Sequence, residues 1–161
     1  MSNQINFDEI YKSLVEKYLQ RSWKIEDGIS EDDILKTEEK LSFKLPIALR
    51  EYYKTVGSCE ELNQAHNFLV ELSELPHIFF DFKNQPEALF EVDENWQSAE
   101  DFLIFMTENQ SVVYWALKVN SINEADPIVW QIVNSLPPEF HSEEKSFSEF
   151  IVEICNWQFN L

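Results

Sequence analysis

The chain has 161 residues, and its 30 acidic residues against 12 basic ones give a formal net charge of −18. A chain of this length forms one domain that buries about 70% of its unfolded surface, without disulfides or metals as staples. The charge disfavours DNA, RNA and anionic membranes as partners and favours a cationic protein. Acidic residues also keep a protein soluble, and this second explanation of the charge stays open.

The sequence favours a cytoplasmic location. Its longest uninterrupted apolar run, Val112–Leu117, is too short to span a bilayer. The N-terminal residues have neither the basic start nor the apolar stretch of a secretory signal. Cys59 and Cys155 lie far apart and show no metal-ligand spacing, which predicts free thiols in a reducing compartment.

Two helices are expected at the N-terminal end. Apolar residues recur at helical spacing over Phe7–Leu19, and a connection follows that ends at Gly28. Ser30 is expected to cap the second helix, with Asp33 in the position of a capping-box partner. In this helix Ile34, Leu41 and also Leu35 are expected to face the core, whereas Glu38, Glu39 and Lys40 are expected to face water.

A third helix is predicted to begin at Leu45-Pro46, because proline fits the first turn of a helix, where its missing N–H costs nothing. Gly57 is expected to end this helix in the left-handed conformation. The face expected to be buried consists of Ala48, Leu49, Tyr52, Tyr53 and Val56.

The next part of the chain shows the alternation of β-strands. Asn67–Leu72 and His77–Phe82 carry apolar residues at every second position, which predicts two strands. A helical turn over residues 71–76 is the alternative. The polar, acid-rich segment 83–100 is interrupted by Pro86 and is predicted to be a long loop.

The centre of the fold is predicted to be a hairpin. Phe102–Met106 and Val112–Leu117 are apolar on both faces, which is typical of strands in the middle of a covered sheet. The polar break between them predicts a turn, so we assign Glu108, Asn109 and Gln110 to turn geometry and capping rather than to catalysis. Trp115, in the second strand, is expected to be buried.

The C-terminal part completes an α+β arrangement. Pro127 suits the first position of a further strand that ends at Val133, and residues 136–138 are expected to form a rigid connector. Ser146 and Glu149 form a capping box at the start of the last helix. We therefore expect a single α+β domain over residues 1–161, with a largely antiparallel sheet of about five or six strands covered by N-terminal helices and a C-terminal helix.

Catalytic and cofactor motifs are not apparent. The two glycines, Gly28 and Gly57, cannot form a phosphate-binding loop, and the three histidines lack the spacing of zinc ligands. Cys155 lies on an apolar helix face, and Glu60 and Glu61 would raise the pKa of Cys59 rather than activate it. We expect no metal, no cofactor and no catalytic residues. An enzyme would require a site built from carboxylates that the sequence does not single out.

One candidate partner-binding patch lies in the long loop. Trp96 follows a run of acids there, and a tryptophan beside acids suits the anchor of an interface with a basic partner. The alternative is that Trp96 folds back and covers the sheet. The candidate patch consists of Glu87, Glu91, Asp93, Glu94 and Trp96.

Several segments in a fixed order resemble the SUKH superfamily. The first is Ile29–Leu41 with Glu38, followed by Leu45-Pro46, Tyr52-Tyr53 and Gly57. Glu108–Trp115 is similar to the Glu-Asn-Gln-x-Val-x-x-Trp hairpin of one subgroup, and Asp126–Val129 and Ser146–Phe150 follow in the expected places. The resemblance covers residues 29–161 and leaves residues 1–28 as an N-terminal helix and connection. Ala116 replaces a glycine that often follows the hairpin tryptophan, and Gly57-Ser58 stands where the family has a glycine-rich helix end.

The superfamily includes bacterial toxin immunity proteins and the yeast cell-wall assembly regulators. The resemblance implies a non-enzymatic α+β protein that binds and neutralises a cognate toxin, often a nuclease. A basic toxin domain would fit the acidic charge of the chain. An intracellular scaffold or regulator of the cell-wall assembly type is the alternative.

Overall fold

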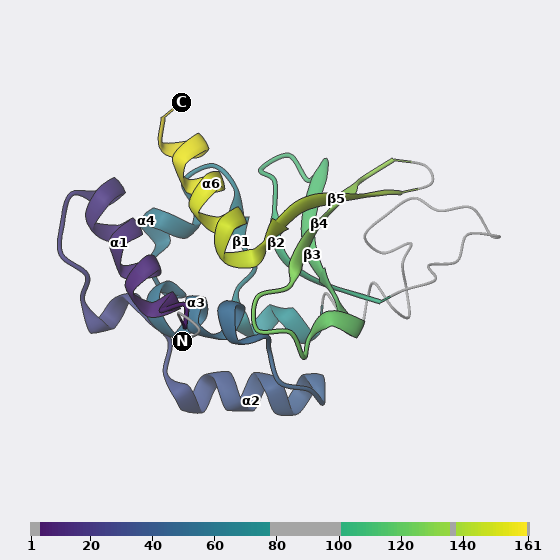
Figure 1. Cartoon of the computed structure of the whole chain (residues 1–161), viewed down its shortest axis with the longest axis horizontal. Coiled ribbons are helices and arrows are strands. Elements are labelled where there is room, and N and C mark those ends of the chain that lie inside the picture. Colours follow the sequence, from purple (N-terminus) through teal and green to yellow (C-terminus); the bar gives the residue numbers. More distant parts are fainter. Residues whose placement is uncertain (1–3, 78–100, 136–137, 161) are drawn as a thin grey trace.

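The computed structural model describes residues 4–77, 101–135 and 138–160. Helices gather at one end of the molecule, the sheet extends from the other, and the C-terminal helix lies between them (Figure 1). The helices are α1 (Phe7–Leu19), α2 (Glu31–Leu41), α3 (Ile47–Val56), the short α4 (Glu60–Asn63) and α6 (Phe147–Phe159). Short 3-10 helices are η1 (Ile25–Asp27), η2 (Leu72–Glu74) and η4 (Val119–Ser121). The α+β prediction is confirmed.

The sheet has five antiparallel strands in the order of the chain. They are β1 (Phe68–Leu69), β2 (Phe102–Thr107), β3 (Val113–Lys118), β4 (Ile128–Val133) and β5 (Glu139–Ser146). The predicted hairpin is confirmed as β2 and β3, which pair Leu103 with Leu117 and Thr107 with Tyr114. A register shift between Ile104 and Met106 interrupts the ladder.

One face of the sheet packs against α6. The ring of Phe105 in β2 lies 5.0 Å from Phe147 and 5.9 Å from Phe150, measured between centroids. Trp115 lies 5.7 Å from Phe150 and is 7% exposed, so its predicted burial is confirmed. The aromatic side chains of α6 therefore fasten the C-terminal helix to the two central strands.

The opposite face carries a second aromatic group. Phe102 stacks on Phe140 of β5 with centroids 5.1 Å apart, and it meets Trp130 of β4 edge-on at 6.4 Å. The ammonium group of Lys118 lies 3.9 Å from the centroid of Trp130, at the distance of a cation–π contact. Strands β2 and β3 are thus apolar on both sides, as the sequence indicates.

Buried tyrosines join the helices to one another and to the sheet. The hydroxyl of Tyr11 in α1 donates to the carbonyl of Ala48 at 2.8 Å, and its ring meets Tyr52 edge-on at 5.0 Å. The hydroxyl of Tyr53 donates to the carbonyl of Val70 at 2.6 Å. Burial raises the pKa of Tyr11 and of Tyr53, so both hydroxyls stay protonated and act as donors.

Both predicted helix caps are present. The hydroxyl of Ser30 accepts a hydrogen bond from the backbone N–H of Asp33 at 3.3 Å. At the start of α6, Ser146 accepts from the N–H of Glu149, and the carboxylate of Glu149 accepts from the N–H of Ser146. The face predicted for α3 is buried as expected.

Two predictions about α2 are wrong. Leu35 is 49% exposed, whereas Glu38 is only 6% exposed. The Glu38 carboxylate accepts a hydrogen bond from the backbone N–H of Leu45 at 2.7 Å and another from Nε of Arg50 at 3.2 Å. Residue 38 follows Ile34 by one turn and shares its buried face, and these two donors compensate its charge.

The expected role of Gly57 is also wrong. Its φ of −60° and ψ of −23° are right-handed, so the position does not need glycine for its backbone conformation. Glycine is favoured at this position because a side chain would have no room. A Cβ at residue 57 would lie 2.5 Å from the carbonyl oxygen of Tyr53 and 2.7 Å from Cδ1 of Ile29.

The strands near residue 70 are shorter than predicted. Strand β1 contains only Phe68 and Leu69, and Phe68 is 40% exposed. The alternative of a helical turn is confirmed, because η2 is a 3-10 helix and the residues from Leu75 to His77 are helical. A strand that begins at His77 is therefore wrong, and residues 78–82 lie outside the described residues.

Strand β5 was not predicted from the sequence. Its residues, EFHSEEKS, are mostly polar because the strand forms one edge of the sheet and much of it faces solvent. Glu144, with a φ of 58°, falls where the register between β4 and β5 shifts. Charge and an irregular register are two means by which natural edge strands resist further pairing.

Candidate functional site

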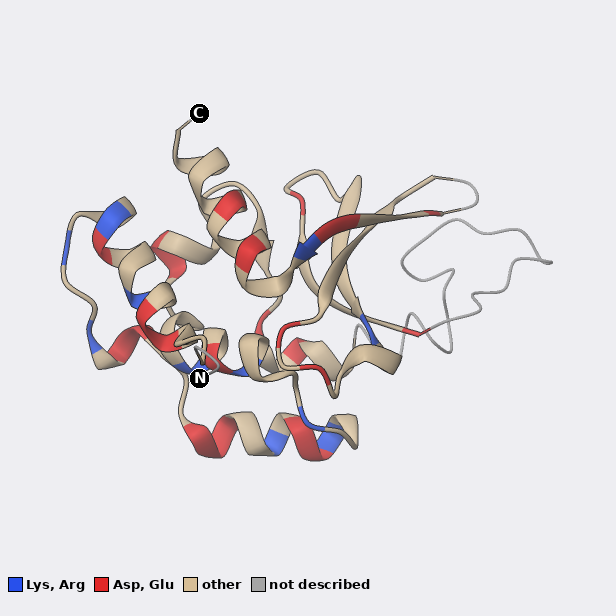
Figure 2. Ribbon diagram, in the orientation of Figure 1, with Lys and Arg blue, Asp and Glu red and all other residues tan. Residues whose placement is uncertain are grey.

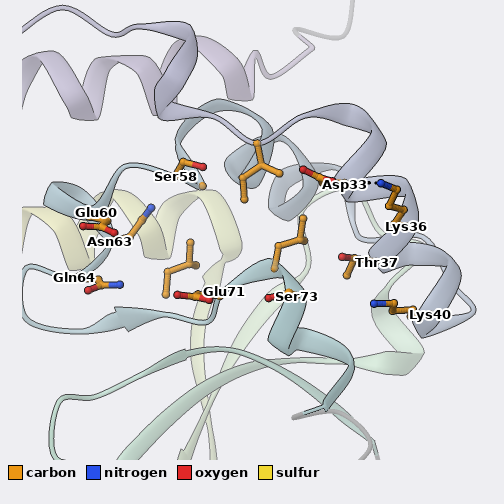
Figure 3. A pocket seen from close by; sticks show the side chains of 14 residues that line it. Asp33, Lys36, Thr37, Lys40, Ser58, Glu60, Asn63, Gln64, Glu71 and Ser73 are labelled. Atoms are coloured by element: carbon orange, nitrogen blue, oxygen red, sulfur yellow. Dashed lines mark ion pairs between the residues drawn. The ribbon is translucent and has the colours of Figure 1, made fainter.

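A groove lies between α2, α4 and η2, with a volume of about 490 Å³. We call it the α2 groove (Figure 3). One wall is a stripe of α2 that comprises Asp33, Lys36, Thr37 and Lys40. Lys36 and Thr37 follow Asp33 by three and four positions, and Lys40 follows them by four and three, so the four residues share one side of the helix.

The opposite wall comes from α4 and η2 (Figure 3). Glu60, Asn63 and Gln64 belong to α4 or follow it directly, and Glu71 and Ser73 belong to the η2 region. Ile29, Leu69 and Leu72 supply the apolar lining. The groove is within the size range of ligand sites and combines apolar surface with separate polar groups.

Asn63, a buried polar side chain of the lining, already has its hydrogen-bond partners. Asn63 is 6% exposed, and its side-chain oxygen accepts a hydrogen bond from the Tyr52 hydroxyl at 2.6 Å. Its amide nitrogen donates to the carbonyl of Val56 at 2.6 Å. Asn63 therefore fixes the position of α4 against α3 and shapes the groove. The exposed groups on the rim, such as Lys40 and Glu60, are those that a ligand would meet.

The α2 groove offers charge and shape for non-covalent binding. Its lining contains neither histidine nor cysteine. Within residues 4–77, 101–135 and 138–160, no group of three or more His, Cys, Asp or Glu side chains is arranged to hold a metal ion. The one ion pair inside the groove, between Asp33 and Lys36 at 3.9 Å, is exposed and contributes little to stability.

Neither cysteine is placed for nucleophilic chemistry. Both are buried and free. Burial raises the pKa of the Cys155 thiol to about 12 and also raises the pKa of the Cys59 thiol. Both thiols are therefore protonated at neutral pH, and a thiol is a much weaker nucleophile than a thiolate.

The sequence pattern of the SMI1 / KNR4 family (SUKH-1) matches residues 28–153. The chain belongs to this family. Members are generally non-enzymatic immunity proteins or related regulators, which act on protein partners. No curated protein shows significant sequence similarity to the chain.

The matched range contains every motif on which the resemblance depends. Leu45 and Pro46 are buried, and the carbonyl of Pro46 accepts a hydrogen bond from the N–H of Arg50 at 2.9 Å in the first turn of α3. Pro127 is buried, and its carbonyl accepts a hydrogen bond from the N–H of Phe147 at 2.9 Å. Pro127 thus links the start of β4 to the start of α6, and the SUKH-1 motifs described here stabilise the fold.

In the hairpin motif, Glu108 also has a structural role. Its carboxylate accepts hydrogen bonds from the backbone N–H of Gln110 at 3.0 Å and of Val112 at 3.2 Å. Glu108 therefore holds the turn between β2 and β3 closed. The side chains of Asn109 and Gln110 are exposed on that turn. Trp115 donates from Nε1 to the carboxylate of Glu143 at 3.1 Å, which ties β3 to the edge strand β5.

The predicted patch at Glu87, Glu91, Asp93, Glu94 and Trp96 lies outside the described residues and stays a prediction. The α2 groove was not predicted from the sequence. Its one sequence signal is the polar stripe of α2, from Asp33 to Lys40, at helical spacing. Most solvent-facing helices have such a stripe, so the pattern alone does not indicate a groove. Within the described residues, no helix is long and apolar enough to cross a membrane.

Proposed function

We propose that this SUKH-1 domain is an immunity protein that binds a basic toxin domain and neutralises it without catalysis. The observation that carries the proposal is the family match over residues 28–153. The family contains immunity proteins and related regulators, and the charge of the chain favours the first of these roles. The regulatory role is the alternative.

The acidic charge fits a cationic partner. A formal charge of −18 on 161 residues attracts a basic protein and accelerates its association. Acidic residues lie on the helices and on β5 alike (Figure 2). A nuclease toxin binds a polyanion in a basic cleft, so an acidic protein can occupy the same cleft and block it.

The predicted loop patch would supply the contact. In this proposal Glu87, Glu91, Asp93 and Glu94 steer the partner, and their effect on the association rate decreases as salt screens them over about 10 Å at 0.1 M. Trp96 anchors the complex and controls its dissociation. Truncation of such an anchor costs about 2 kcal/mol or more.

The proposal can be tested by asking whether this protein protects cells from a toxin. The toxin-like polypeptides encoded next to this gene are expressed one at a time in a sensitive strain, with and without this protein. We expect growth to be restored for one of them, together with a complex of the two proteins that survives gel filtration. A Trp115→Ala variant, in which the fold is weakened, serves as the negative control. Lack of protection against every neighbouring toxin would contradict the proposal and favour the regulatory role.

A further inference from the structure

A second cavity, of about 800 Å³, opens where the loop before α2 crosses the start of α1 and one side of α3. We call it the Trp23 cleft. Trp23, Ile25 and Ile29 supply its apolar lining. Ile25, in the helix η1, is 77% exposed, so its side chain is accessible to a ligand in the cleft.

The loop that carries Trp23 is fastened at several points. Arg21 donates two hydrogen bonds to the carboxylate of Asp27, at 2.8 and 2.9 Å, and Trp23 donates from Nε1 to the carbonyl of Thr55 at 2.8 Å. At Gly28 the loop touches α3 so closely that a Cβ would lie 1.9 Å from the carbonyl oxygen of Lys54. The cleft is therefore largely preformed, which lowers the entropy cost of binding.

The charged side chains that line the cleft are mostly acidic. Asp8, Glu26, Glu31 and Glu51 line it, against the single cation Lys54. By contrast, the α2 groove sets Lys36 and Lys40 against three acids. The Trp23 cleft is thus the more acidic of the two cavities.

Two of the four carboxylates have no cation of their own. Asp8 pairs with Lys12 at 2.9 Å, and Glu31 pairs with Arg50 and also with Lys54, the latter at 3.9 Å. The ion pairs found among the described residues involve neither Glu26 nor Glu51. Lys12 lies over one face of the Trp23 ring, with its ammonium group 4.3 Å from the ring centroid, so the indole already accepts one cation. Within the described part of the chain, the cleft therefore presents two uncompensated carboxylates near this indole and an exposed isoleucine.

We propose that the Trp23 cleft receives an arginine side chain from a basic protein partner. This inference rests on the proposed function and adds a contact that the loop patch does not include. A guanidinium group donates in parallel to carboxylate oxygens and also packs on aromatic faces, whereas an ammonium group is a compact, strongly hydrated point charge. Carboxylates beside an indole suit the first of these groups.

The cleft is only partly a family feature. Trp23, Ile25 and Glu26 precede residue 28, where the SUKH-1 match begins, whereas Glu31 and Glu51 lie inside it. The lining of the cleft therefore comes partly from the matched range and partly from α1 and the connection that follows it. The lining residues outside the matched range are therefore suited to determine which partner binds.

The test uses the full chain labelled with ¹⁵N and the peptide acetyl-Gly-Arg-Gly-amide as the probe. Its titration should shift the Trp23 indole N–H signal and the backbone signals of Ile25, Gly28 and Ser30. The same peptide with citrulline, which keeps the shape but lacks the charge, should bind about fivefold more weakly. Equal binding by the lysine peptide would overturn the choice of arginine.

A pair of double variants separates the cleft from the overall charge. Glu26→Gln with Glu51→Gln should weaken binding of the arginine peptide about fivefold, because both uncompensated carboxylates are lost. Glu16→Gln with Glu39→Gln removes the same charge from exposed sites elsewhere and should change binding less than about twofold. Equal weakening in both variants, or shifts spread over the whole acidic surface, would overturn the inference. Neither result bears on protection in cells, so failure of the cleft and failure of the immunity function are distinguishable.

Discussion

The carboxylate of Glu38 lies 2.7 Å from the backbone nitrogen of Leu45 and closes the turn between α2 and α3. Arg50, one turn into α3, donates to the same carboxylate at 3.2 Å and also pairs with Glu31 at the start of α2. A single buried acid thus links α2 to the loop before α3 and to α3 itself. Both helices contribute walls to the cavities described above.

Glu38→Ala should lower the free energy of unfolding by about 3 kcal/mol. The substitution leaves the buried N–H of Leu45 without an acceptor and the partly buried Arg50 with one carboxylate fewer. Urea melts of the two proteins measure the loss. Glu39→Ala, at the exposed neighbouring position, is the control and should change stability by about 0.5 kcal/mol or less. Similar losses for both variants would show that Glu38 has no special structural role.

The structure explains which features the sequence could predict. The hairpin of β2 and β3 was predictable because Phe105 and Trp115 belong to runs that are apolar on both faces. The caps at Ser30 and Ser146 were predictable because each acts within a few residues of the chain. Local patterns of this kind need no knowledge of the tertiary fold.

The features that were missed depend on contacts between distant or irregular segments. The partner of Glu38 is a backbone N–H in a loop, which has no signature in residue type. Strand β5 is polar because it lies at an edge, so its alternation is weak. The Trp23 cleft exists because Gly28 approaches the backbone of Lys54, a contact that residue types alone do not reveal.

Trp115→Ala should cost about 3–5 kcal/mol in a urea melt, because it removes a buried ring that packs on Phe150. It also removes the hydrogen bond to Glu143. Trp115→Phe keeps an aromatic ring at the site but loses the hydrogen bond and part of the buried ring system, so it should cost less than the alanine variant. A loss under about 1 kcal/mol for the alanine variant would contradict the central place of the hairpin in the core.

The pair of Arg21 and Asp27 should make stability depend on pH. Hydrogen bonds from Arg21 hold the pKa of Asp27 below its ordinary value, although burial of the carboxylate opposes them. Because the folded-state pKa is depressed, this stabilisation is complete above the unfolded-state pKa of about 3.9 and is lost as pH falls through the folded-state value. The free energy of unfolding of the native protein should therefore decrease more between about pH 5 and pH 3 than that of Asp27→Asn.

Urea melts at several pH values check this prediction, and Asp32→Asn provides the control. Asp32 is an exposed acid near the start of α2, so its removal changes the net charge as much as the removal of Asp27 does. We expect its pH profile to follow that of the native protein. Parallel profiles for Asp27→Asn and the native protein would contradict the role given to the pair.

The purified protein should contain no stoichiometric transition metal and should not hydrolyse nucleic acids, nucleotides or esters. This expectation follows from the protonated thiols and from the lack of a metal-ligand cluster among the described residues. Elemental analysis and standard hydrolase assays measure both properties. A stoichiometric zinc ion that is lost on substitution of any one of the histidines would contradict it.

The most direct test of the central claim is the salt dependence of association with any toxin domain that the protection experiment identifies. Stopped-flow mixing at increasing salt concentrations should show that the association rate constant falls steeply while the dissociation rate constant changes little. This result follows if acidic residues of the domain steer a basic partner, because salt screens exposed charges over about 10 Å at 0.1 M. An association rate constant that is independent of salt, or a partner that is itself acidic, would contradict the claim.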